Sequence, residues 1–252
     1  CMYGFVVVGS RRMQPVQDLP VGIDSLVGEL QEHPVNANEF FRTFKERQLS
    51  LQQLRVFIRQ YHYFCFHFVK VLEGLLYYTP IEYIEMRAEL AKTLYSELGS
   101  GSPERVHILQ LERFARSIGL YPRDLEDTEP ITEVSMYLEI LRRLFLRSSY
   151  LTALGAELAV ETTAASEFQY FLSGLQQYKR FTRRDLEFFE MHVAEEEIHC
   201  QWLVDAVRKT AKSDDDLCEV TNGAREVADA WLEFWDGMYR AVFDSNPSDA
   251  FN

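Results

Sequence analysis

The pattern of apolar and polar positions along the chain favours helices over strands. Segments such as residues 38–47 are amphipathic with a helical period, whereas runs of two-residue period joined by hairpin turns are almost absent. No proline occurs between residues 131 and 246, and such a stretch suits long helices because an internal proline costs about 3 kcal/mol. The pattern therefore predicts an all-α protein.

Capping residues and helix breakers place the boundaries. Ser50, with Gln53 three residues later, forms a capping box that starts a long helix. The run Gly99-Ser100-Gly101 ends the next helix, and Ser102 followed by Pro103 starts another. The expected helices cover residues 38–47, 50–79, 81–98, 102–119, 132–145, 148–178, 182–211 and 213–243, with a loop at 121–130. About seven helices without a linker indicate a single-domain bundle.

The chain ends differ from this helical body. The opening residues are apolar but too short for a signal peptide. We expect an N-terminal extension at residues 1–30, a helical domain at 31–245 and a C-terminal tail at 246–252.

Charge and cysteine usage narrow the function classes. The 39 acidic residues exceed the 26 basic ones, giving a net charge of −13, which argues against nucleic-acid and anionic-membrane partners. No apolar run approaches the roughly 20 residues of a membrane span. The four cysteines are widely spaced, which fits free thiols in a reducing compartment. We therefore expect a cytoplasmic protein.

The strongest chemical signal is the motif His192-x3-Glu196-x2-His199. At about 100° per residue, its three side chains fall within about 60° of one another on one helix face. Two imidazoles and a carboxylate form a typical metal-ligand set, and 6 His with 39 acidic residues in 252 positions give roughly 0.02 such motifs by chance. A solvated acidic face is the alternative, and the neighbouring Phe188 and Phe189 argue against it.

A second group of candidate ligands lies upstream. Glu97 ends one predicted helix and His107 lies near the start of the next, with Glu104 three residues before His107. Acidic residues at a helix start are also favoured by the helix dipole alone, so this pair supports a metal site chiefly in combination with the first motif.

A third group lies on the predicted helix 148–178. Glu157 and Glu161 stand there among small and apolar residues, where a carboxylate is costly to bury unless it is paired or bound to a metal. The two lie about 40° apart on the helix, so either could be the inward ligand, and a solvent-facing Glu is the alternative. Mixed carboxylate and imidazole ligands suit Fe, Mn or Zn.

The spacing of these groups resembles that of the haem-oxygenase-like non-haem diiron oxidases and oxygenases. The resemblance rests on the His192 motif, on Glu161 about thirty residues before it, and on the pair Glu97 and His107. The amino-acid sequences of residues 40–57 and 94–120 are also similar to the family. It spans about residues 36–245. It implies a single-domain, seven-helix haem-oxygenase-like bundle that binds two Fe²⁺ ions and uses dioxygen as cosubstrate.

The same resemblance implies the site residues. The implied metal ligands are Glu97, His107, Glu161, His192, Glu196 and His199, with Glu161 bridging and with Glu161 and Glu196 as the catalytic carboxylates. Family members usually have Asp where this chain has Glu196, a departure that alters the geometry at that ligand. Whether Glu73, Glu104 or Glu157 also coordinates stays open.

Family members modify small molecules in biosynthetic pathways, so an O2-dependent oxidoreductase of natural-product biosynthesis is expected. Its substrate would be a small amino-acid-like molecule that undergoes desaturation, cyclisation, C–C cleavage or N-oxygenation; a fatty acid is the alternative. The aromatic segment 61–68 is either a core stripe or the wall of a substrate pocket, with Tyr61 or His62 contacting the substrate. Association into a homodimer stays open.

Three other readings compete with this one. A ferritin-like diiron carboxylate protein would use Glu73, Glu104, His107, Glu161, Glu196 and His199 and leave His192 idle. A thiaminase relative would need a nucleophilic cysteine, for which Cys200 and Cys65 are the candidates. A non-catalytic helical interaction protein would bind no stoichiometric metal.

Overall fold

The computed structural model describes residues 22–244, and helices make up most of them. Ten α-helices and no strand occur in this part of the chain: α1 (Ile23–Glu32), α2 (Glu39–Glu46), α3 (Leu51–Tyr78), α4 (Ile84–Glu97), α5 (His107–Ser117), α6 (Pro122–Glu126), α7 (Thr132–Arg147), α8 (Tyr150–Leu175), α9 (Glu187–Thr210) and α10 (Asp214–Tyr239). Two 3₁₀ turns, η1 (Pro34–Ala37) and η2 (Pro103–Arg105), and a π-helical turn, η3 (Arg240–Asp244), complete the order. The all-α prediction is confirmed.

The expected count of seven helices is wrong, because short helices without strong sequence signals were overlooked. α1 begins after Gly22, which offers no side-chain cap. α6 has only five residues and lies in the segment read as a loop; Pro122 occupies its first turn and Asp124 Oδ2 accepts from the Tyr121 N–H. The helix expected from Ser102 onward is split, because Val106 leaves helical geometry between η2 and α5.

The described residues leave out parts of both expected termini. Residues 1–21 of the predicted extension and the predicted tail at 246–252 lie outside them. In the described remainder of that extension, Leu26 and Leu30 of α1 are buried in the hydrophobic core.

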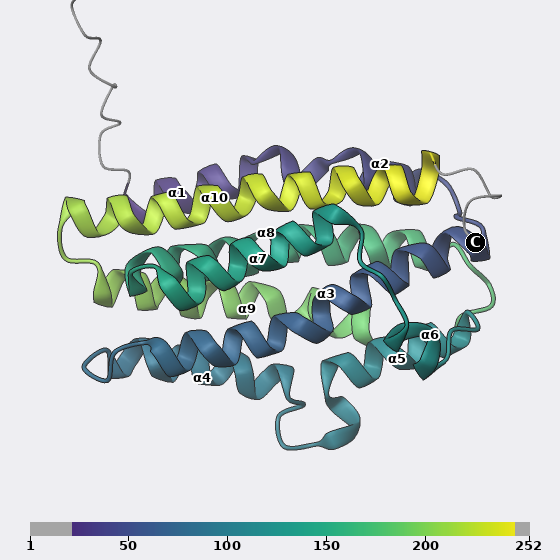
Figure 1. Ribbon diagram of the computed structural model, residues 1–252, viewed down its shortest axis with the longest axis horizontal. Coiled ribbons are helices and arrows are strands. Elements are labelled where there is room, and N and C mark those ends of the chain that lie inside the picture. The colour runs from purple at the N-terminus through teal and green to yellow at the C-terminus, as the bar shows by residue number, and fades with distance from the viewer. Residues whose placement is uncertain (1–21, 245–252) are drawn as a thin grey trace, which may run out of the picture.

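The longest helices run side by side (Figure 1). α8 packs along both α9 and α10, while α3 packs against α4, α5 and α7. Two glycines explain the close approach of α8 and α10. A Cβ at Gly155 would lie 1.9 Å from the Val220 carbonyl oxygen, and one at Gly223 would lie 2.0 Å from that of Thr152. Only glycine lets these two backbones meet.

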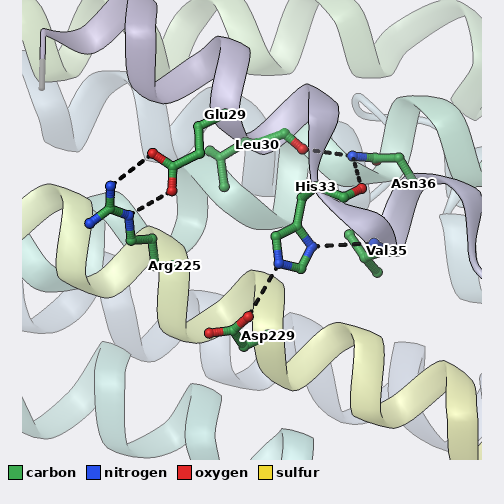
Figure 2. Close-up of polar contacts among 7 residues, drawn as sticks. All are labelled: Glu29, Leu30, His33, Val35, Asn36, Arg225 and Asp229. Atoms are coloured by element: carbon green, nitrogen blue, oxygen red, sulfur yellow. Dashed lines mark hydrogen bonds and ion pairs between the residues drawn. The ribbon is translucent and has the colours of Figure 1, made fainter.

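Hydrogen bonds and ion pairs connect α1 to α10 (Figure 2). Both carboxylate oxygens of Glu29 accept from the Arg225 guanidinium, at 2.6 and 2.9 Å, and these hydrogen bonds lower the pKa of Glu29. His33, which ends α1, accepts from the Val35 N–H at Nδ1, so its Nε2 carries the proton that faces Asp229 at 3.2 Å. His33 is thus engaged at this helix junction.

Aromatic side chains fill the core between the helices. Phe40 and Phe41 of α2 pack against Trp235 of α10, with ring centroids 5.0 and 4.8 Å apart, and Phe57 and Phe171 join from α3 and α8. Within residues 22–244, no helix has both the length and the apolar character needed to cross a membrane.

Candidate metal centre

Three of the predicted ligands converge from three helices. One donor atom each from Glu97 of α4, His107 of α5 and His192 of α9 lies within 4.8 Å of the others. The two imidazole rings meet edge to face at 4.6 Å between centroids. Both histidines are buried, and Glu97 is largely so. Such a group of donors can hold one metal ion.

The turn between α4 and α5 brings Glu97 to His107. Gly99 has a φ of +84°, and a Cβ there would lie 2.4 Å from the Ser102 carbonyl oxygen. The neighbouring Ser100 and Gly101 also have positive φ. A chain reversal this tight needs the left-handed conformation that glycine adopts without strain, so the glycine-rich run places the start of α5 beside the end of α4.

The ring of His192 is held in one orientation. Its Nδ1 lies 2.7 Å from the Phe188 carbonyl oxygen, and because a carbonyl only accepts, Nδ1 carries the proton and Nε2 keeps its lone pair. Phe168 stacks on the ring at 4.1 Å between centroids. Burial and the nearby His107 lower the pKa of His192, which keeps the imidazole neutral, as metal ligation requires.

A second pair of predicted ligands lies beside the first group. His199 Nδ1 lies 3.2 Å from Glu161 Oε2, and both residues are buried. Glu161 lines the same cavity as Glu97, His107 and His192. Five of the six predicted ligands therefore come together from four helices.

Glu157 adds a carboxylate to this region. It is fully buried beside Glu161, and neither of its oxygens accepts a hydrogen bond from an N–H group or a cation in the described residues. Burial raises its pKa well above the usual range, and the charges of Glu161 and Glu97 raise it further. A buried carboxylate with unpaired oxygens is costly, and a nearby metal ion would remove that cost.

Glu196 completes the predicted set by its position alone. Its side chain lies outside the described residues, although α9 is helical throughout and keeps Glu196 on the face shared by His192 and His199. Its assignment as a ligand stays a prediction.

The donor atoms of this cluster are placed better for binding a metal ion than for hydrogen-bonding to one another. His107 Nδ1 and Glu97 Oε2 approach to 3.1 Å, yet Nδ1 makes no hydrogen bond of acceptable angle. Such a pair of ligating atoms, close together but poorly aligned for a hydrogen bond, is expected where both atoms coordinate the same ion. Together with the unpaired Glu157, this geometry suits a bound cation.

The ligands peculiar to the ferritin-like alternative lie elsewhere. Glu73 is 39% exposed and receives a hydrogen bond from Lys70 at 2.6 Å. Glu104 is fully exposed in η2 and accepts from the Ser102 hydroxyl. His192, which that alternative leaves idle, sits inside the cluster.

The cavity beside the cluster has a volume of about 60 Å³. Tyr61, Phe64, Cys65 and Phe68 of the aromatic segment form part of its wall, whereas His62 lies in a separate hollow with its Nε2 3.7 Å from Glu112. The segment is thus both a core stripe and a pocket wall. Burial, with the charge of Glu97, raises the pKa of the Cys65 thiol, which disfavours a thiolate nucleophile.

The sequence interpretation missed one carboxylate in this cavity. Glu167 lies on α8 beyond Glu161, is 2% exposed and lines the cavity. The available signal was composition, because Glu157, Glu161 and Glu167 are the only charged residues of α8. The burial argument applied to the first two holds equally for the third.

Comparison with known proteins identifies the family. A sequence model of the family described as iron-containing redox enzymes, which is haem-oxygenase-like, matches residues 55–232, well over half of the chain. The chain belongs to this family. The resemblance inferred from the ligand spacing is thereby confirmed, and the iron of the family's description agrees with the donors at the cluster.

Two curated relatives are similar over most of their length. A 4-aminobenzoate synthase of Nitrosomonas europaea is 24% identical over 229 residues, covering 86% of this chain and 89% of the relative. A 4-chloro-allylglycine synthase of Streptantibioticus cattleyicolor is 23% identical over 244 residues, covering 95% and 92%.

Solved structures show the same fold. A CADD-like protein of unknown function from Nostoc punctiforme has a TM-score of 0.73 at 20% identity, covering 87% of this chain and 98% of its own. A domain with a haem-oxygenase-like fold from Shewanella denitrificans (TM-score 0.72, 15% identity, 91% and 97%) and a TenA homologue from Pseudomonas syringae (0.72, 15%, 91% and 98%) are also similar. The chain thus has a haem-oxygenase-like fold.

Proposed function

We propose that this protein is a non-haem diiron oxidase or oxygenase that activates dioxygen and modifies a small amino-acid-like molecule in natural-product biosynthesis. The observation that carries the proposal is the meeting of Glu97, His107, Glu161, His192 and His199 from four helices beside one cavity. Carboxylate-rich donor sets of this kind hold pairs of iron ions in helical bundles.

The ligand roles follow from how the donors are grouped. Glu97, His107 and His192 would hold one ion, and Glu161 with His199 would hold the other. Glu161 adjoins His199 and lines the same cavity as the first group, so it would be the carboxylate shared between the two groups. Glu196 is the sixth ligand by its helical position. The carboxylates would offset most of the charge of two Fe²⁺ ions.

Iron, when bound, supplies the activation of dioxygen and the oxidation of a C–H or N–H bond. The chain itself supplies orientation and exclusion of water. Phe168 stacks on the His192 ring, and the Phe188 carbonyl accepts a hydrogen bond from His192 Nδ1–H. These two contacts hold the imidazole in one orientation before a metal binds. The aromatic wall of the cavity keeps bulk water from the reacting groups.

The small cavity and the two relatives support a small substrate. The two relatives are named for 4-aminobenzoate and 4-chloro-allylglycine, both of which carry an amino group and a carboxylate. A cavity of about 60 Å³ has room for a few waters or a comparably small group. A long acyl chain would need a larger tunnel, so an amino-acid-like substrate is favoured over a fatty acid.

Anaerobic reconstitution with Fe²⁺ tests the proposal. We expect about two irons per chain and, after exposure to dioxygen, oxygen consumption that depends on one member of a panel of amino acids. A response to fatty acids with none to amino acids would overturn the substrate class. Absence of stoichiometric iron would overturn the diiron assignment and favour a non-catalytic helical protein.

A further inference from the structure

Glu167 is a buried carboxylate that the metal cluster does not use. It faces the cavity from α8, and its two oxygens are held from two other helices. The Tyr61 hydroxyl of α3 donates to Oε1 at 2.6 Å, and the Trp231 indole N–H of α10 donates to Oε2 at 3.0 Å. The carboxylate is therefore fixed in one orientation by three helices.

Neither donor carries a charge that could balance the carboxylate. No Lys or Arg occurs among the described residues that line the cavity, whereas Glu97 and Glu161 share its wall. Burial raises the pKa of Glu167 to about 8, although hydrogen bonds from Tyr61, Trp231 and Trp235 lower it. A buried carboxylate without a cationic partner is costly, so the site is built to receive either a proton or a cation.

The cavity offers such a cation a defined place. The two carboxylate oxygens together have four lone pairs, so acceptor capacity remains beyond the donors Tyr61, Trp231 and Trp235. Phe64, Phe68, Val160 and Phe168 supply apolar wall close to Glu167 and the metal cluster. An organic cation with a short apolar body matches both surfaces.

We propose that Glu167 binds the protonated amino group of the substrate while the metal ligands of the same cavity face its reacting carbon or nitrogen. The proposal rests on the proposed function in that the metal cluster is taken as the reaction centre. It names the substrate class as small amines, including amino acids, and makes Glu167 the residue that selects them. A carboxylate without an amine would meet three glutamates and no lysine or arginine in the described lining.

A purely structural role for Glu167 is the competing explanation, because its hydrogen bonds join α3, α8 and α10. The two explanations differ in ligand selectivity. A structural carboxylate would affect all ligands through stability, whereas a binding carboxylate would affect only those that carry an ammonium group.

Calorimetric titration of the anaerobic Fe²⁺-loaded protein distinguishes them. The probes are n-butylamine, n-butanol and butyrate, which share a four-carbon chain and differ in head group. We expect wild-type protein to bind n-butylamine at least tenfold more tightly than the other two. Glu167→Gln should remove that preference, and Glu139→Gln, the same change at a 70% exposed side chain of α7, should keep it.

Two further measurements keep the outcome decisive. Glu167→Asp retains the charge on a shorter side chain, so it should weaken amine binding yet keep the preference, and it replaces Glu167→Gln should that variant fail to fold. Titration of metal-free protein separates this proposal from the diiron assignment, because Glu167 is not a metal ligand. Equal binding of the three probes by wild type, or an amine preference that persists in Glu167→Gln, would overturn the proposal even where two irons bind.

Discussion

Glu97 and His107 face each other across the turn between α4 and α5, with Oε2 and Nδ1 3.1 Å apart and no hydrogen bond between them. They are ten positions apart in the sequence, and the glycine-rich turn decides whether they meet. The conformation of the loop between α4 and α5 thus determines whether Glu97 and His107 can bind the same ion.

Replacing Gly99 with Ala should separate these two donors. The left-handed backbone costs a non-glycine residue about 1–2 kcal/mol, and the new Cβ would also meet the Ser102 carbonyl oxygen at 2.4 Å. We expect iron binding to fall at least tenfold with a smaller loss of thermal stability, measured by metal analysis and calorimetry. Gly22→Ala, where no atom lies within 4 Å of the new Cβ, is the control; equal iron affinity in both variants would contradict this account.

Replacing His192 with Ala should reduce the bound iron from about two per chain to one or fewer, because the first group loses one of its two imidazoles. His67→Ala, on α3 and away from the cluster, should bind iron as wild type does. Unchanged iron content in His192→Ala would instead support a ligand set in which His192 is idle.

Divalent metal should stabilise the protein. The cluster gathers Glu157, Glu161 and Glu97, and an ion that binds only the folded state at a hundredfold excess over Kd adds about 2.7 kcal/mol. At this chain length that corresponds to a rise in Tm of roughly 5–10 °C. Differential scanning calorimetry with Fe²⁺ or with a chelator measures it, and a Tm insensitive to both would speak against a metal site.

The stability of metal-free protein should fall as pH rises, in part through Glu167. Its pKa is raised from 4.5 to about 8 in the fold, so its stabilising effect is complete below pH 4.5 and is lost as pH rises toward about 8. Each pKa unit is worth about 1.4 kcal/mol, which sets an upper limit of about 5 kcal/mol for this residue. Urea unfolding at pH 5 and pH 8 should show a smaller decline for Glu167→Gln than for wild type; identical declines would refute the assignment.

Replacing Gly155 with Ala should destabilise the bundle. Its Cβ would overlap the Val220 carbonyl, and forced repacking in a core typically costs about 1–3 kcal/mol or more. Gly28→Ala is the matched control, since it lies within α1 with no atom within 4 Å of the new Cβ and should stabilise by up to about 1 kcal/mol. Thermal unfolding of the two variants should shift in opposite directions.

Local signals predicted the long helices well. The Ser50–Gln53 capping box starts α3 in the structure as it does in the sequence, and the proline-free stretch after residue 131 holds α7 to α10. The sequence did not predict α1, which lacks a capping side chain, or α6, which has only five residues. Short helices depend on packing against neighbours rather than on their own residues.

The sequence by itself determined what lies on one helix. The positions of His192, Glu196 and His199 along one face follow from the helical period, whereas the apolar neighbours of Glu157 and Glu161 left open which of the two faces inward. Tertiary structure alone decided the rest: that His107 and His192 meet, that Glu157 is buried beside Glu161, and that Glu167 accepts from Tyr61 and Trp231. Residues on different helices have no fixed spacing in the sequence, and their distances arise only when glycine contacts and aromatic packing fix how the helices lie together.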